Sequence, residues 1–362
     1  MFLGSISGLI FSFLSTFSVI PIVNFFSLRL NLVDKPEKRK QHKKNIVRLG
    51  GVGIFLGVYI AIWLLLSLNL LEVDDKNLLW PIFYCAPLFF FLGLIDDLKV
   101  ISPFIRLILQ FIISFFVWSN GIQINSLLFQ SFGEMISIEL NPIISCLFTI
   151  IWISGMINAI NWMDGLDGLA AGIISISLAG LILIGLFNGS NESIYLLFCI
   201  FGACLAFLIY NVYPAKILMG DGGSYLIGFF ASTLSLYFTN SNNDLSEIKF
   251  SVIQIILLFL VPILDMIIVI FSRFKKGQSI FFPDRSHIHH RFIDLGFSHK
   301  DTVLIIFAIS QFFVTLSLLI TLENFQLIIF SSSFIVLMKI CYEKFDIKSL
   351  LKLRIYPRKI RF

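Results

Sequence analysis

The acidic residues of this 362-residue chain gather at the ends of long apolar segments, and the clearest case is the adjacent pair Asp96 and Asp97. Two neighbouring carboxylates can bind a metal ion, or one can act as a base while the other orients it. The alternative is a solvated helix end. Adjacent acids at a helix C-terminus oppose the helix dipole, however, so a purely structural role is poorly motivated. We therefore predict that both acids are catalytic.

A second cluster places a polar residue at every third position: Asn158, Asn161, Asp164 and Asp167. On a helix this spacing draws a slowly drifting stripe along one face. The stripe begins inside an apolar segment, where polar groups are costly and are usually functional. Helix capping and interhelical hydrogen bonds are the alternative, but four spaced groups exceed what a cap needs. We predict that the two asparagines bind substrate and that the two aspartates take part in catalysis.

Asp221 lies in the glycine-rich string Gly220 to Ser224, just before another apolar segment. An aspartate there can simply cap the helix. A glycine-rich turn that opens a helix also presents free N–H groups to phosphate, and a carboxylate beside that phosphate can hold Mg²⁺. We predict that Asp221 and Asp97 bind Mg²⁺, or Mn²⁺ in its place.

Three histidines, His287, His289 and His290, follow Arg285 in a basic loop. Zinc is one candidate ligand for clustered histidines, although the chain has no HExxH motif and no cysteine near them. Arginines and histidines together suit a phosphate or diphosphate. We predict that these four residues bind substrate.

The segment between residues 34 and 51 is strongly basic and includes His42, Lys43 and Arg48. Part of this charge is a topology signal, and a dense basic run also attracts nucleotide or lipid phosphates. We predict that these three residues contact substrate. Two further charged residues lie within apolar segments. Arg106 is expected to extend to the membrane interface. Asp265 either joins neighbouring helices through a buried hydrogen bond or positions residues of the site without contacting the substrate.

The whole composition is that of a membrane protein, with 57% hydrophobic residues, 14% charged residues and a mean hydropathy of +0.93. Soluble domains carry about 25% charged residues. Segments of roughly 20 apolar residues recur along the chain, which is the length that spans a bilayer. We therefore predict an all-α polytopic membrane protein with eleven spans near residues 4–26, 50–71, 79–95, 103–118, 141–160, 169–187, 193–213, 222–239, 250–271, 301–320 and 324–341.

Basic residues concentrate in alternate loops. Lys and Arg number eight between Ser27 and Leu49, six between Ser272 and Lys300, and seven between Glu343 and Phe362. The positive-inside rule then puts the N-terminus outside, the C-terminus in the cytoplasm, and every cluster named above on the cytoplasmic side. We expect one transmembrane catalytic domain over 1–342, a basic cytoplasmic tail over 343–362, and a short external β-hairpin between Ile124 and Leu140.

These strings resemble the polyprenyl-phosphate N-acetylhexosamine-1-phosphate transferases, glycosyltransferase family 4. The resemblance rests on NxxNxxDGxDGLA together with the acid pair, the Asp221 string and PDRSHIHHR. The family's HxxPxPRxGG string is matched less well, because Asn45 and Val47 replace both prolines. The resemblance implies an eleven-helix membrane fold with a cytoplasmic active site in the plasma (inner) membrane.

The resemblance also implies a reaction in which a lipid phosphate attacks the β-phosphorus of a UDP-sugar in the presence of Mg²⁺ and releases UMP. Asp96 and Asp97 correspond to the family's acid pair, and Asp221 corresponds to its metal ligand. The stripe from Asn161 to Asp167 corresponds to the nucleotide-facing segment. The histidine loop corresponds to the phosphate and sugar contacts.

The expected partners are therefore a UDP-N-acetylhexosamine, undecaprenyl phosphate and the bilayer, with no nucleic acid and with a homodimer left open. Arg285 precedes the histidines in the form seen in the GlcNAc branch, which favours UDP-GlcNAc as the donor. Transfer of phospho-MurNAc-pentapeptide is the alternative within the superfamily. A membrane transporter is the alternative from another class, but transporters bind near the bilayer midplane and often show repeats.

Overall fold

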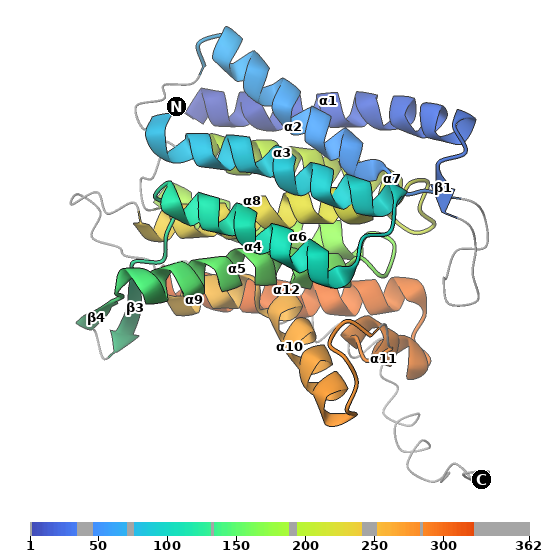
Figure 1. The fold of residues 1–362 in the computed structure, drawn as a ribbon. Coiled ribbons are helices and arrows are strands. Elements are labelled where there is room, and N and C mark those ends of the chain that lie inside the picture. The colour runs from blue at the N-terminus through green and yellow to red at the C-terminus, as the bar shows by residue number, and fades with distance from the viewer. Residues whose placement is uncertain are drawn as a thin grey trace, which may run out of the picture.

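The computed structural model describes residues 2–34, 46–70, 76–131, 134–187, 194–240, 252–282 and 285–321. His42 and Lys43, the expected eleventh span at 324–341 and the basic tail at 343–362 lie outside these residues. The described chain is overwhelmingly helical (Figure 1).

Twelve helices make up the described part of the chain, and most of them run side by side in one bundle (Figure 1). Their bounds are α1 Phe2–Arg29, α2 Gly50–Ser67, α3 Lys76–Leu98, α4 Pro103–Ser119, α5 Pro142–Met163, α6 Leu169–Phe187, α7 Ile194–Asn211, α8 Gly220–Asn240, α9 Val252–Leu258, α10 Leu260–Lys275, α11 Ile288–Asp294 and α12 His299–Thr321. Each of the ten expected spans up to residue 320 coincides with a helix or, in the ninth case, with a pair of helices.

Seven of the described helices are long and apolar enough to cross a membrane, and the number rises to eight if α9 and α10 form one span. The protein is therefore an all-α polytopic membrane protein. Helix α4 is apolar but only 17 residues long. Helix α8 lies at the centre of the bundle (Figure 1), and nearly its whole length is buried.

Four short strands complete the described fold. β1 (Val33–Asp34) pairs antiparallel with β2 (Ile46–Val47), and β3 (Ser126–Ser131) pairs antiparallel with β4 (Glu134–Glu139). The second pair falls in the stretch for which a hairpin was expected. The first pair places the residues after α1 beside those before α2. A parallel bridge from Val47 to Ile217 then brings the residues before α2 beside those before α8.

The ninth expected span is broken, with an angle of 81° between α9 and α10. Pro262 lies in the first turn of α10 and has no N–H to donate to the carbonyl of Leu258. Ser177 Oγ on α6 donates to that carbonyl over 2.6 Å instead. The Ser177 hydroxyl thus supplies the hydrogen bond that the Leu258 carbonyl lacks because of the proline. Apolar surroundings offer no water to do so. As a result α10 turns away from the bundle axis (Figure 1).

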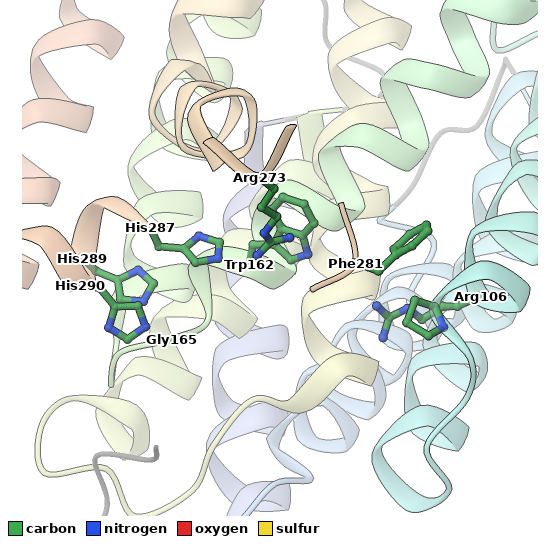
Figure 2. A pocket seen from close by; sticks show the side chains of 9 residues that line it. Arg106, Trp162, Gly165, Arg273, Phe281, His287, His289 and His290 are labelled. Carbon is green, nitrogen blue, oxygen red and sulfur yellow. The ribbon is translucent and has the colours of Figure 1, made fainter. Parts of the chain in front are cut away.

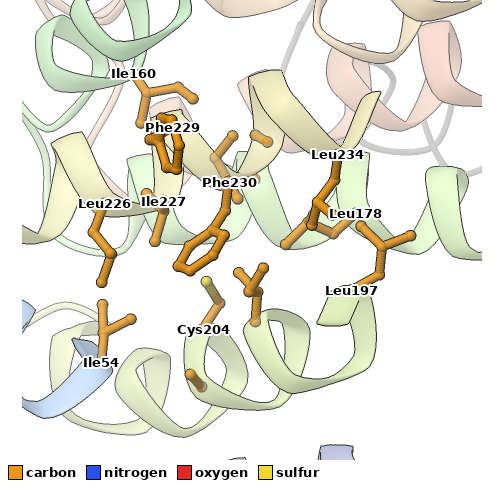
Figure 3. Packing of buried hydrophobic residues seen from close by; sticks show 14 of the residues in the cluster. Ile54, Ile160, Leu178, Leu197, Cys204, Leu226, Ile227, Phe229, Phe230 and Leu234 are labelled. Atoms are coloured by element: carbon orange, nitrogen blue, oxygen red, sulfur yellow. The ribbon is translucent and has the colours of Figure 1, made fainter. Parts of the chain in front are cut away.

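Aromatic and aliphatic side chains of α8 pack against those of α2, α5, α6 and α7 in the core (Figure 3). Phe229 stacks on Phe89 of α3 with ring centroids 4.8 Å apart. At the N-terminal end of α8 the packing is closer, because a Cβ on Gly51 would clash with the backbone of Gly223. Glycines therefore let the starts of α2 and α8 touch, which fixes the residues around Asp221.

Candidate active site

Asp97, at the end of α3, is bound to the first turn of α8. Its carboxylate accepts hydrogen bonds from the backbone N–H groups of Asp221 at 2.9 Å and Gly222 at 3.0 Å. A carboxylate at a helix N-terminus is favourable, because it satisfies free donors and complements the helix dipole. Gly220, with φ of +78°, makes the turn into α8. The acid pair and the Asp221 string are thus brought together, although 124 residues separate them.

Arg48 joins the two carboxylates. Its guanidinium lies 3.3 Å from Asp97 Oδ1 and donates to Asp221 Oδ1 over 2.7 Å. The backbone before α2 is held in place because Gly50 N–H donates to the Leu218 carbonyl and Gly51 N–H to that of Met219. Of the three basic-loop residues predicted to contact substrate, Arg48 is the one in the described structure, and it lies against the acids.

Asn161 belongs to the same cluster. Its amide nitrogen donates to Asp221 Oδ1 at 2.8 Å and to Ser224 Oγ at 3.0 Å. Asp221 itself is only 8% exposed. A buried carboxylate is stable where several donors surround it, and here an arginine and an amide fill that role.

Asp96, the other member of the pair, turns towards α4. It accepts from Arg106 over 2.5 Å and from the Ile101 backbone N–H over 2.8 Å. The expectation that Arg106 extends to the membrane interface stays a prediction, because the structure does not locate that interface. A buried carboxylate one helix away holds the guanidinium, as is usual for charges inside apolar segments.

Asp164 and Asp167 follow the end of α5 and have different surroundings. Asp167 accepts a hydrogen bond from the Ala215 backbone N–H at 2.9 Å, in the loop before α8. Within the described residues the carboxylate of Asp164 has no hydrogen-bond partner. Burial raises the pKa of Asp164 to about 8; Arg48 lowers it, and the neighbouring acids Asp221 and Asp97 add to the rise. Asp164 can therefore exchange a proton near neutral pH.

Asn158 lies deeper in the bundle than the other polar residues of its stripe. Its amide donates to Gln110 Oε1 on α4 at 2.6 Å and to the Ser154 carbonyl at 2.7 Å. These contacts are interhelical and local, of the kind that joins helices in a membrane. The structure thus does not bring Asn158 into contact with the acids.

The histidine segment forms a second part of the site, around a cavity of about 300 Å³ (Figure 2). The cavity is lined by Pro103, Arg106, Trp162, Gly165, Arg273, Phe281, His287, His289 and His290. His289 packs against Gly165, where a Cβ would clash with its ring. The three predicted histidines therefore do lie together, beside the end of α5.

Arg285 does not line this cavity. Its side chain is 67% exposed and donates to Oδ1 of Asp294, the last residue of α11, over 3.0 Å. The lining residues that were not predicted to belong to the site include Trp162, Arg273 and Arg106. Trp162 sits inside the Asn161 string, and the Arg273 guanidinium lies 4.8 Å from its ring centroid. A charged residue near the end of an apolar segment was the available signal for both arginines.

A second cavity, of about 240 Å³, opens beside Asp97 and Arg48 of the acid cluster. Asn31, Leu32, Val33, Arg48, Leu49, Asp97 and Leu98 line it. Asp97 and Arg48 thus face one cavity while Arg106, paired with Asp96, faces the other.

The donor set of the acid cluster suits a hard cation. Among the described residues no three histidine, cysteine or acidic side chains are grouped so as to hold a metal by themselves. Mg²⁺, however, is commonly bound by one or two carboxylates together with substrate phosphates. The Arg48 guanidinium between Asp97 and Asp221 shows that this position accepts positive charge. The two carboxylates therefore fit Mg²⁺ or Mn²⁺ once a diphosphate supplies further oxygens.

Comparisons with known proteins show which family the chain resembles. Residues 79–239 match the family described as glycosyl transferase family 4. This range contains the acid pair, the Asn161 string and Asp221. The matched range and the apolar helices are those of a membrane-embedded transferase of that class.

Relatives from distant bacteria match over most of their length. A probable undecaprenyl-phosphate N-acetylglucosaminyl 1-phosphate transferase from Bacillus subtilis is 34% identical over 84% of this chain and 81% of its own. A decaprenyl-phosphate N-acetylglucosaminephosphotransferase from Mycobacterium tuberculosis is 31% identical, over 83% and 78%. An undecaprenyl-phosphate alpha-N-acetylglucosaminyl 1-phosphate transferase from Salmonella typhi is 30% identical, over 84% and 80%. This chain belongs to the same family, the polyprenyl-phosphate N-acetylhexosamine-1-phosphate transferases.

Proposed function

We propose that this protein transfers GlcNAc-1-phosphate from UDP-GlcNAc to undecaprenyl phosphate and releases UMP, which starts a lipid-linked glycan of the cell envelope. An oxygen of the lipid phosphate would form a bond to the β-phosphorus while the bond from that phosphorus to the UMP oxygen breaks. One observation carries the proposal: Arg106 forms an ion pair with Asp96 and also lines the cavity that contains the three histidines. This contact supports a single site that includes both the proposed phosphate-binding groups and the acid pair.

Each part of the site has a proposed task. Phosphoryl transfer depends on alignment and charge neutralisation more than on covalent help. Histidines 287, 289 and 290 and Arg285 would bind the donor's phosphates and sugar. Arg48, with His42 and Lys43 of the basic loop, would attract phosphate groups, and Asn158 and Asn161 would support the nucleotide side. Asp96, Asp164 and Asp167 would complete the catalytic acids, with Asp164 able to hold a proton near neutral pH.

Mg²⁺, or Mn²⁺ in its place, would be held by Asp97 and Asp221 and would neutralise charge on the diphosphate. Removal of divalent ions with EDTA should abolish turnover, and added Mg²⁺ should restore it. Activity that persists in EDTA, or a requirement for tightly bound zinc, would contradict this assignment.

The membrane arrangement is part of the proposal. The distribution of Lys and Arg supports an external N-terminus, a cytoplasmic C-terminus, eleven spans, an external β3–β4 pair and an active site on the cytoplasmic side of the plasma membrane. One catalytic domain would then cover 1–342 with a basic tail after it, and a homodimer remains compatible with the chain. Family membership favours transfer over transport.

A panel of donors tests the proposal. Purified protein with undecaprenyl phosphate and Mg²⁺ is given UDP-GlcNAc, UDP-GalNAc or UDP-MurNAc-pentapeptide, and UMP release is measured. We expect the highest kcat/KM with UDP-GlcNAc. A preference for the pentapeptide donor would move the protein to the other branch, and no UMP from any donor would refute the proposed chemistry.

A further inference from the structure

An acid that is not part of the cluster described above is built into the other side of the site. Asp265 lies on α10, just beyond the bend, and is 3% exposed. Its Oδ2 is 2.8 Å from His287 Nδ1, and its Oδ1 accepts the backbone N–H of Ile288 at 2.6 Å. One carboxylate therefore holds both the ring of His287 and the start of α11.

The ring of His287 is restrained on its other sides as well. The indole of Trp162 meets it edge-on with centroids 5.8 Å apart, and the ring of His289 lies nearly parallel to it at 5.4 Å. Figure 2 shows His287 between Trp162 and the other two histidines, at the wall of the cavity. Because Nδ1 is engaged by Asp265, Nε2 is the ring nitrogen that remains available to a ligand.

The three histidines differ in this respect. Nδ1 of His289 and Nδ1 of His290 are buried without a hydrogen-bond partner among the described residues. Burial lowers the pKa of both side chains, and the neighbouring positive groups lower it further. In the described part of the chain, His287 alone of the three has a carboxylate hydrogen-bonded to its ring. His287 is therefore the member of the trio whose ring is paired with a carboxylate.

We infer that Asp265 is a positioning residue that orients His287 and stabilises its protonated ring, so that Nε2–H donates to a phosphate oxygen of the bound nucleotide sugar. This inference rests on the proposed function. A carboxylate that accepts Nδ1–H fixes the ring orientation and balances the second proton, as the carboxylate partners of catalytic and metal-bound histidines do. The resulting charge-assisted hydrogen bond gains strength as negative charge grows on the phosphate oxygens.

The test begins with Asp265→Asn. The amide oxygen can still accept the N–H of Ile288, while its nitrogen faces Nδ1 and no longer stabilises a protonated ring. We expect kcat for UMP release to fall roughly 10- to 100-fold, the size of one such contribution, while KM for UDP-GlcNAc changes less than about threefold. The matched control is Asp301→Asn, which replaces an acid in the first turn of α12 that lines neither cavity and should change kcat less than about twofold.

A double-mutant cycle separates positioning from simple support of the fold. Asp265→Asn is measured in the unaltered protein and in His287→Asn. If Asp265 acts through His287, its substitution costs less than about twofold in the His287→Asn background, since coupled residues are not additive. An equal cost in both backgrounds would overturn the inference. Each variant is first checked for folding by size exclusion and thermal unfolding.

Asp265→Glu supplies a second route, because it keeps the charge and moves it by one methylene. Asp265→Glu should keep a higher kcat than Asp265→Asn. If Asp265→Asn does not fold, Asp265→Glu replaces it in the double-mutant cycle. Glutamate and asparagine variants of equal activity would count against a role for the charge. Failure of the unaltered protein to release UMP would refute the proposed function itself, which is a different result from an additive cycle in an active enzyme.

Discussion

The acid cluster and the histidine cavity are built in opposite ways. Around Asp97 and Asp221, three chain segments touch through glycines and backbone hydrogen bonds, and nearly every carboxylate oxygen has a donor. The histidine segment instead lies on a short helix beside a cavity and is joined to the bundle through Asp265. A fixed arrangement suits the reacting phosphates, which need alignment. A cavity walled by side chains suits recognition of the sugar.

The largest expected effect on turnover follows from removing a negative charge from the acid cluster around Asp97 and Asp221. Asp97→Asn takes away a carboxylate that binds two backbone N–H groups of α8 and the Arg48 guanidinium. We expect UMP release to fall by roughly a hundredfold or more. Asp301→Asn, an acid in the first turn of α12, serves as a matched control and should keep most of its activity. Near-normal turnover of Asp97→Asn would remove the cluster from the mechanism.

A pair of glycine substitutions compares the two regions directly. A Cβ at Gly93 would clash with the backbone carbonyl of Asp221, whereas one at Gly165 would clash with the ring of His289. Backbone cannot move aside, but a ring at the wall of a cavity can. We expect Gly93→Ala to reduce kcat at least about tenfold more than Gly165→Ala, and to lower the melting temperature further, because overpacking typically costs 1–3 kcal/mol.

The comparison would fail if Gly165→Ala were the more damaging of the two. That outcome would mean that the histidine wall, and not the acid cluster, is the rigid part of the site. Both variants are measured at saturating UDP-GlcNAc, so that altered donor affinity does not hide the difference.

A smaller effect concerns the stability contribution of Asp164. Its folded-state pKa of about 8 lies above the value of about 3.9 for an unfolded aspartate. Between these values the folded protein holds more protons than the unfolded protein, so this residue makes stability fall as pH rises from about 4 to about 8. Asp164→Asn should therefore show a shallower fall in melting temperature between pH 5 and pH 8. An identical slope in both proteins would show that Asp164 is already ionised at pH 5.

Much of the fold could be predicted because a bilayer demands long apolar segments, and ten such segments coincide with helices. The break in the ninth segment depends on Pro262, which leaves the carbonyl of Leu258 without its helical donor, and on the hydroxyl of Ser177, which donates to that carbonyl. Only the packed structure reveals this contact. The residue types of the site were also readable, since acids and histidines are rare in apolar segments.

Their partners were not readable from the sequence. Spacing put Asn158 on the same stripe as Asn161, yet one lies against Gln110 and the other against Asp221. The direction of Arg106 and the stacking of Arg273 on Trp162 depend on which helices become neighbours. Periodicity within one segment carries no information about which helices pack against one another.

The central claim is that phosphorus moves together with the sugar, and the most direct measurement follows the phosphorus itself. UDP-GlcNAc labelled with ³²P at the β position is incubated with the purified protein, undecaprenyl phosphate and Mg²⁺, and the lipid and aqueous fractions are counted. We predict that the label enters the lipid fraction while unlabelled UMP appears in equal amount. Label that remains in water as UDP, with sugar alone on the lipid, would contradict the account.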